Sequence, residues 1–311
     1  MPKELLIFLA FLIVFFSGLW YLFKTRSRDA DEDETTYLAR TGDPEAMNSM
    51  GLACFIDGDL QDAIGWYRKA ADKGLASAQM NLCRVYAYGP ESVRDYSGAE
   101  HWLEKALAQG DLEALYELGN RHFSWRAPGS DPKKAFDSWF AAAKKGHERA
   151  ATMVGWAYRT GYGIDANLGR AAEWFEKAGQ LGSPVAMIRL ADMYRTGDGI
   201  KINGRRAFML YAQAVASEWN PNDSQDDYLN AHYQLGKYHS EGLVAEQNDR
   251  KAAKHWRSAA ERDCPQACYE LGLSYREGRG VRRSRIRAEH WLRRAAELGV
   301  TETGGEPERS G

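Results

Sequence analysis

One pattern of apolar and polar positions recurs about every 36 residues along the chain after residue 36. Its clearest mark is a tryptophan or a substitute at seven equivalent positions: Trp66, Trp102, Ser138, Trp174, Leu210, Trp256 and Trp291. The steps between these positions are 36, 36, 36, 36, 46 and 35 residues. A fixed period of this length indicates stacked structural repeats rather than ordinary compact domains.

Three columns of alanine support the register, because each holds alanine in all seven copies. The first is Ala46, Ala78, Ala114, Ala150, Ala186, Ala231 and Ala267. The second, three residues before the marker, is Ala63, Ala99, Ala135, Ala171, Ala207, Ala253 and Ala288. The third, four residues after it, is Ala70, Ala106, Ala142, Ala178, Ala214, Ala260 and Ala295. Side chains this small at fixed positions let helices pack closely.

Each copy predicts two helices joined by a tight turn. In the last copy Ala267, Leu271 and Tyr275 form an apolar stripe at helical spacing, Gly278 and Gly280 end that helix, and a second helix covers 287–296. Such a hairpin does not bury its apolar face alone, so the copies must stack. We predict an all-α fold, an α-solenoid of about seven helix-turn-helix repeats near residues 46–77, 78–113, 114–149, 150–185, 186–230, 231–266 and 267–299.

The first residues carry a different pattern. From Leu5 to Phe23 nineteen residues carry no charge, and a helix of that length reaches about 28 Å, close to one hydrocarbon core. No small-x-small cleavage site follows, so the segment predicts an uncleaved anchor. Lys3 precedes the span, whereas Lys24, Arg26 and Arg28 follow it. We expect a single-pass protein of the cell inner membrane, with its repeats in the cytoplasm rather than the periplasm.

These patterns divide the chain into four parts: 1–23 as the transmembrane anchor, 24–36 as a charged connector, 37–299 as the solenoid and 300–311 as a disordered tail. Residues 35–44 resemble the end of an earlier second helix and would cap the stack. Residues 218–228, where the step of 46 falls, read as an acidic inserted loop.

The net charge of −2, from 41 Lys and Arg against 43 Asp and Glu, gives no global positive field, so we expect no nucleic-acid partner. The exception is a local cluster in the last repeat: Arg276, Arg279, Arg282, Arg283, Arg285, Arg287, Arg293 and Arg294. Such a cluster suits an acidic partner or anionic lipid, or else forms a solvated end cap.

The residues from Ala267 to Val281 and from Arg170 to Gly182 resemble the two halves of the Sel1-like repeat, a relative of the tetratricopeptide repeat. The resemblance covers about residues 46–299 and, together with the N-terminal span, indicates a membrane-anchored bacterial type. It departs locally, because the first copy lacks the Gly-x-Gly turn and the third has Trp125 and Pro128-Gly129 there. The resemblance implies an adaptor or scaffold that binds a protein or peptide.

We expect no enzyme activity, no cofactor and no metal site, because no catalytic or metal-ligand constellation has the required spacing. A formal Ser-x-x-Lys from Ser130 to Lys133 keeps a β-lactamase-like hydrolase as a remote alternative, although Asp131-Pro132 reads there as a helix start. The cysteines either pack as thiols or, in an oxidising compartment, form bridges: Cys54, Cys83, Cys264 and Cys268.

A solenoid of this type binds partners along the first helices of its repeats, on a concave surface. Exposed first-helix positions lie off the alanine, leucine and tyrosine stripe. The predicted contact residues are Arg84, Glu117, Asn120, Trp156, Arg159, Arg189, Asp192, Arg195, Lys237 and Glu241. An alternative function is an envelope-facing inhibitor, an immunity protein of a toxic enzyme, which would place the repeats outside the cytoplasm.

Overall fold

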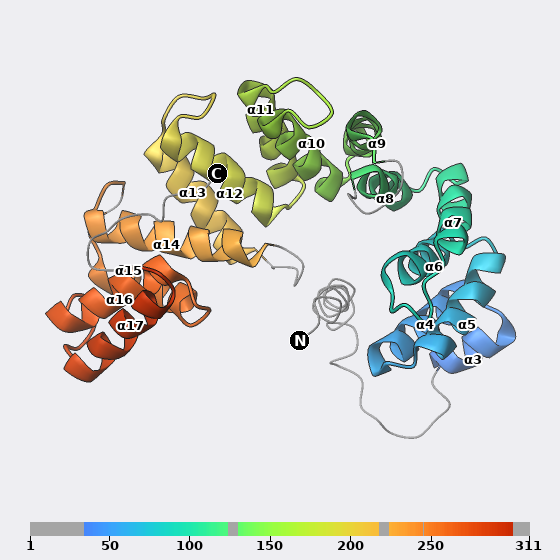
Figure 1. Cartoon of the computed structure of the whole chain (residues 1–311), viewed down its shortest axis with the longest axis horizontal. Helices are drawn as coiled ribbons and strands as arrows, with labels where there is room; N and C mark the ends of the chain where they lie inside the picture. The colour runs from blue at the N-terminus through green and yellow to red at the C-terminus, as the bar shows by residue number, and fades with distance from the viewer. Residues whose placement is uncertain (1–33, 124–129, 218–223, 245, 301–311) are drawn as a thin grey trace. The chain divides into compact units, whose positions relative to one another are not determined.

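The computed structural model describes residues 34–123, 130–217, 224–244 and 246–300, and these fold entirely as helices and turns (Figure 1). The expected anchor, the tail, and Trp125 with Pro128-Gly129 lie outside the described residues. Fifteen helices are described: α3 (Glu34–Thr41), α4 (Pro44–Asp57), α5 (Leu60–Asp72), α6 (Ala76–Tyr88), α7 (Tyr96–Ala108), α8 (Leu112–Phe123), α9 (Pro132–Lys144), α10 (Glu148–Thr160), α11 (Leu168–Gln180), α12 (Pro184–Thr196), α13 (Gly204–Ala216), α14 (Gln225–Glu241), α15 (Asp249–Ala260), α16 (Pro265–Glu277) and α17 (Arg285–Glu297).

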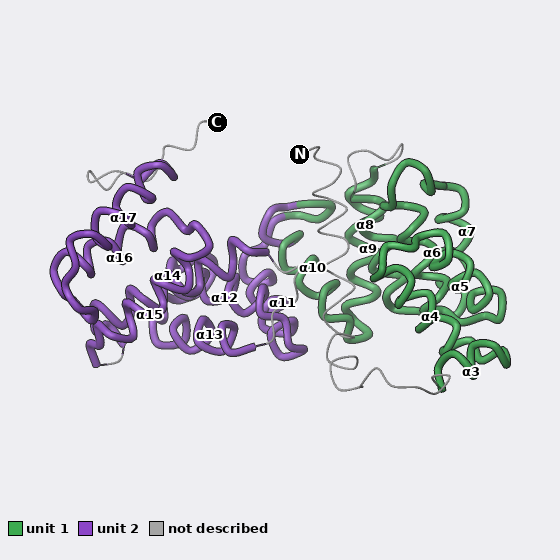
Figure 2. The backbone as a smooth tube through the Cα atoms, turned by 90° about the horizontal axis from the view of Figure 1, so that it is seen from below, with its two compact units in different colours: residues 1–157, 162–165, 220–222 green, residues 158–161, 166–219, 223–311 purple. Residues whose placement is uncertain are grey.

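The chain divides into two compact units, coloured separately in Figure 2. Unit 1 contains the hairpins α4/α5, α6/α7 and α8/α9, and unit 2 contains α12/α13, α14/α15 and α16/α17. The predicted fourth repeat is shared, because the division falls within residues 158–166. Helix α3 packs on α4, as expected for a cap, and it begins at Glu34, inside the segment predicted as connector. None of the helices in the described ranges has the length and apolar character needed to cross a membrane.

A recurrent backbone hydrogen bond closes the hairpins. In six repeats the residue that caps the second helix donates its N–H to a carbonyl near the end of the first helix, at 2.7–3.0 Å. The six capping residues are Asp95, Asp131, Asn167, Asn203, Asn248 and Ser284. Each also accepts a backbone N–H through its side-chain oxygen, which satisfies a helix-end donor that lacks an intrahelical partner. Sequence therefore fixes where each second helix begins.

All 21 alanines of the three columns are buried, with at most 6% of their surface exposed. This confirms that the three columns are buried, as close packing between helices requires. The third repeat, which has Ser138 at the marker position, fills the space with its neighbour Trp139, whose side chain is fully buried. Trp139 packs against the backbone of α8 at Gly119, where an added Cβ would lie 2.3 Å from the indole ring. Only glycine fits there.

The prediction of a loop over 218–228 is wrong at its C-terminal end. Ser224 caps α14 by accepting the N–H of Asp227, and the helix begins at Gln225. Asp227 is buried and paired with Arg189 of the preceding repeat, which favours helix where composition alone suggested a turn. The inserted residues thus make α14 a 17-residue helix, whereas the first helices of the neighbouring repeats, α12 and α16, have 13 residues.

Candidate partner-binding surfaces

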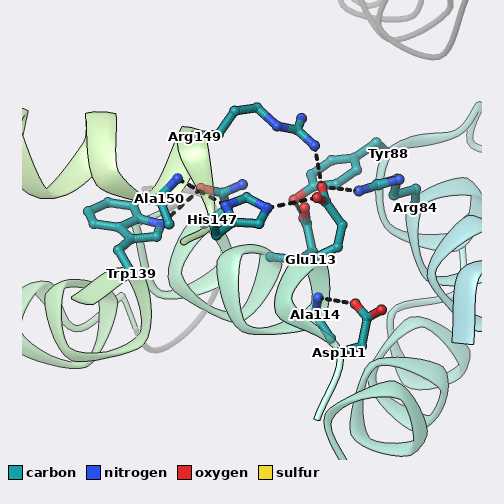
Figure 3. Close-up of polar contacts among 11 residues, drawn as sticks. Arg84, Tyr88, Asp111, Glu113, Ala114, Trp139, His147, Arg149 and Ala150 are labelled. Carbon is teal, nitrogen blue, oxygen red and sulfur yellow. Dashed lines mark hydrogen bonds and ion pairs between the residues drawn. The ribbon is translucent and has the colours of Figure 1, made fainter. Parts of the chain in front are cut away.

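A network of charged side chains connects three consecutive first helices of unit 1 (Figure 3). Arg84 of α6 and Arg149 of α10 both donate to Oε1 of Glu113 at the start of α8. His147 accepts the N–H of Ala150 at Nδ1, so its Nε2 carries the hydrogen and donates to Glu113 Oε2 at 2.9 Å. One carboxylate therefore bridges side chains of the repeats before and after its own.

The charge of Glu113 is fixed by these neighbours. Burial raises the pKa of this carboxyl, but the hydrogen bond from His147 and the charges of Arg84 and Arg149 outweigh it and lower the pKa to about 2. Tyr116 contributes to the same cluster, with its ring stacked on His147 and under the guanidinium of Arg149. Glu113 is therefore ionised throughout the physiological range and acts as an electrostatic link.

Unit 2 has a second network at the equivalent register. Asp192 lies six residues after the alanine of the first column in its repeat, as Arg84 does in its own repeat. Asn230 lies one residue before the alanine of that column, as Glu113 does. Asn230 Nδ2 donates to Asp192 Oδ2 at 3.0 Å, across the two repeats. Asp192 also accepts from the Tyr211 hydroxyl at 2.5 Å and from Arg195 at 3.2 Å. The same pair of positions thus joins first helices in both units.

The predicted contact residues of unit 1 are Arg84, Glu117, Asn120 and Trp156. Arg84 pairs with Glu113, and Asn120 accepts from the indole N–H of Trp139 at 3.1 Å. The half-buried ring of Trp156 lies among aromatic rings of unit 1, with centroids 5.3 Å from Tyr162 and 5.5 Å from Phe123. The prediction that Glu117 is exposed is wrong: it is 6% exposed and accepts from the Tyr88 hydroxyl, because α6 covers this face of α8.

The predicted contact residues of unit 2 are charged and, except for Asp192, more accessible. The side chains of Arg159, Arg189, Arg195, Lys237 and Glu241 are 33–46% exposed. Each also has an intramolecular partner: Arg159 pairs with Asp198, Arg189 with Asp227, Arg195 with Asp192, and Lys237 with Glu241. The structure thus places all six residues on first helices and assigns each a bond within the chain.

Sequence reasoning missed Glu113, Arg149, Asp227 and Asn230. They lie before the first alanine column, at the start of α8 and α10 and in the first two turns of α14, outside the apolar stripe of the first helices. The sequence did contain a detectable signal, which is the complementary polarity of two positions. The first position lies six residues after the alanine of the first column, and the second lies one residue before that alanine in the next copy.

Three histidines of unit 2 are packed together between α14 and α15. His232 Nδ1 lies 3.1 Å from His255 Nδ1, and the ring of His239 stacks on His255 at 5.7 Å. His232 and His239 are buried. Burial, together with nearby positive charge, lowers the pKa of both His232 and His255 to about 4. No group of three or more His, Cys, Asp or Glu side chains is placed to hold a metal ion in the part of the chain that is described.

Acidification is expected to destabilise unit 2 through this histidine pair. The unfolded chain binds a proton at each imidazole near pH 6.5, whereas the folded chain does so only near pH 4, so the unfolding free energy falls as the pH drops through this window. The expected loss is about 2 kcal/mol for each imidazole. Urea unfolding at pH 7 and pH 4.5 measures it. Between the two pH values, the His255→Gln variant should lose less unfolding free energy than the native chain. The control variant at an exposed position, His101→Gln, should lose the same amount as the native chain. Equal losses in all three proteins would contradict the assignment of the effect to the histidine pair.

All four cysteines are free thiols in this structure. Burial raises the pKa of Cys83 and of Cys268 to about 12, which keeps both protonated at neutral pH. In the formal Ser-x-x-Lys segment, Asp131 caps α9 and Pro132 occupies its first turn, as the sequence predicted. These residues have structural roles here.

The fold is an α-solenoid of two-helix repeats. The Sel1 repeat model matches residues 39–75, 76–111, 149–183, 184–217, 229–264 and 265–300, and the chain belongs to the Sel1 repeat family. The third predicted copy is not among these matches, although α8 and α9 form the same kind of hairpin. This copy departs from the family pattern at the marker, where Ser138 stands in place of tryptophan, and in the sequence of its turn.

Similar proteins share this architecture. A protein of unassigned function from Neisseria meningitidis is 27% identical over 72% of this chain, and a Sel1-repeat-containing protein of Escherichia coli, YjcO, is 30% identical over 50% of it and 72% of its own length. This chain spans 44% of the Neisseria protein. The crystal structure of c5321, a protective antigen of uropathogenic Escherichia coli, superimposes with a TM-score of 0.69 at 26% identity, over 94% of this chain and 62% of that one.

Proposed function

We propose that the protein is a non-catalytic interaction scaffold of the inner membrane that binds a partner protein or peptide along the first helices of its repeats. Leu5–Phe23 would hold it in the bilayer, with the repeats in the cytoplasm. Family membership supports the binding role, because Sel1 repeats generally mediate protein–protein interactions. The identity of the partner is set by the charges that the first helices leave accessible.

The observation that carries the proposal is the pair Arg159 and Arg195. They occupy equivalent positions in the last turns of α10 and α12, and their side chains are 33% and 39% exposed. A guanidinium has five donors, and each of these two uses only part of its set on an intramolecular carboxylate. Donors therefore remain for a carboxylate of another chain, which arginine binds in bidentate geometry. An acidic segment fits two such sites one repeat apart.

The test is capture of partners from native membranes by the full-length chain. With Arg159→Glu and Arg195→Glu together, at least one protein identified with the native chain should be lost, because two donors become repulsive carboxylates. The matched control is Lys133→Glu with Lys145→Glu, two exposed positions at α9 with the same change of net charge. Circular dichroism checks that both variants fold. An identical set of captured proteins in the native chain, the variant and the control would refute the proposal.

A further inference from the structure

The turns inside the repeats of unit 2 lie along one edge. A Cβ atom added to Gly199, in the turn before α13, would lie 2.2 Å from Leu168 at the start of α11. Gly280, in the turn before α17, is as close to Asp249 at the start of α15, with the added Cβ 2.0 Å from its carbonyl oxygen. The turn before α15 completes the row, because Val244 approaches Gly204 at the start of α13. We call these three turns, with the first turns of α11, α13, α15 and α17, the turn edge.

Aliphatic side chains protrude from the turn edge. Unit 2 has six exposed large apolar residues among those described, and four of them lie here: Leu168, Ile202, Leu243 and Ile286, at 38%, 64%, 66% and 81% exposure. They are separated from each other by one turn or one helix start. Each comes from a different turn or helix start, and two of them have an exposed basic residue beside them in the sequence, Lys201 beside Ile202 and Arg285 beside Ile286.

The same edge is rich in unpaired positive charge. Five exposed basic residues make no ion pair or side-chain hydrogen bond within the described ranges: Lys201, Arg205, Arg250, Arg282 and Arg283. The first turns of α13, α15 and α17 add the positive ends of three helix dipoles. Of the acidic residues nearby, Asp198, Glu277 and Glu289 are held in ion pairs, and Glu246 and Asp249 are not. The positive charges are in excess.

Two turns of unit 1 lack this combination. In unit 1 the corresponding turn between α6 and α7 contains Glu91, Arg94 and Asp95, and Arg94 is bound to the carbonyl of Gly89. The turn between α4 and α5 follows Asp57, the last residue of α4, and contains Asp59. Unit 1 therefore has no matching excess of positive charge at these two turns.

We propose that the turn edge of unit 2 binds the surface of a bilayer that contains anionic phospholipid. The unpaired arginines and lysine contact lipid phosphates, and Ile202, Leu243 and Ile286 enter the boundary between headgroups and acyl chains. Basic residues alone would suit an acidic protein equally well. Exposed aliphatic side chains set among basic ones are what a lipid interface accommodates, since the charges contact phosphates while acyl chains surround the aliphatic groups. The inference does not depend on which partner the first helices bind.

The experiment uses the full chain in two bilayers, phosphatidylcholine alone and a 3:1 mixture with phosphatidylglycerol. Amide hydrogen exchange is followed in the peptides that cover 197–206, 242–251 and 278–287. Any N-terminal anchor is present in both bilayers, so a difference between them reports on lipid charge. We expect at least a fivefold slower exchange of the turn edge in the anionic bilayer, and less slowing at high salt.

Two variants and a control separate the contributions. Arg250→Gln with Arg282→Gln and Arg283→Gln should abolish the slowing, and Ile202→Ser with Leu243→Ser and Ile286→Ser should reduce it in both salt conditions. The control variant, Lys73→Gln with Lys133→Gln and Lys145→Gln, removes three positive charges outside the turn edge. It should show the same slowing of exchange as the native chain. Equal exchange in the two bilayers would overturn the proposal. Loss of the slowing in the control variant would also overturn it. So would slower exchange with a polyglutamate peptide but with neither bilayer, because that result would assign the turn edge to an acidic protein.

Discussion

Replacing Glu113 by Gln is expected to lower the free energy of unfolding of unit 1 by about 2–3 kcal/mol. The change keeps the size of the side chain but removes the anion between Arg84 and Arg149, and it leaves two partly buried guanidinium groups to repel each other. The folded-state pKa near 2 means that the carboxylate stabilises the fold above its unfolded pKa of about 4.5 and ceases to do so as the pH falls through 2. The full effect is therefore present at neutral pH.

Native-state amide exchange of the full chain measures this effect locally. Amides of α8 should exchange faster in the Glu113→Gln variant, whereas those of α16, in unit 2, should not change. The matched control is Glu104→Gln on α7, an exposed carboxylate that forms no ion pair or side-chain hydrogen bond among the described residues. A change below about 0.5 kcal/mol in α8 would show that the network contributes little to stability.

Gly119→Ala is expected to destabilise unit 1 by about 3 kcal/mol, at the upper end for overpacking. The new methyl group would lie 2.3 Å from Trp139 Cδ1 and 2.4 Å from Nε1, closer than non-bonded atoms approach. Trp139 is fully buried and its N–H is bound to Asn120, so the ring has no free space into which to move. Urea denaturation followed by circular dichroism gives the size of the loss.

Gly65→Ala is the control of opposite sign. Gly65 lies in the interior of α5, and an added Cβ meets no atom within 4 Å. Alanine there should stabilise the helix by about 0.5–1 kcal/mol, because it restricts the unfolded chain without a clash. If both substitutions shifted stability in the same direction, close packing against Trp139 would not be the reason for glycine at position 119.

Several features of the fold were predictable because they depend on short sequence distances. The alanine columns and the glycines that end the first helices are recognisable within a single copy of the repeat, although Gly199 and Gly280 also pack against the preceding copy. The irregular third repeat was also predictable, because its columns persist although the family model does not match it. The structure at the end of the inserted segment was not predictable in this way. Residues 225–228 are helical, and Asp227 among them is buried and paired with Arg189, which lies 38 residues earlier in the chain.

The candidate surfaces show the same division. Arg159 and Arg195 were recognisable from the repeat register alone, and the structure adds that Asp198 and Asp192 occupy part of their donors. Glu117 satisfied the same register rule and is nevertheless buried, because its neighbour is a tyrosine from the preceding repeat. Register identifies the face of a helix. It does not identify the side chain that the next repeat places against that face.

The sequence by itself determined the all-helical repeat fold, its period and its three buried alanine columns, because small side chains at fixed spacing are required wherever two helices approach closely. Only the tertiary structure decided which charges meet across repeats, as at Glu113 and at Asp192 with Asn230, and which protruding side chains share one edge, as Ile202 and Ile286 do. The physical reason is that the charged contacts join residues 29 to 38 positions apart and the protruding residues are 84 positions apart. Periodicity shows which positions can face each other, but not which side chains the packing of neighbouring repeats brings into contact.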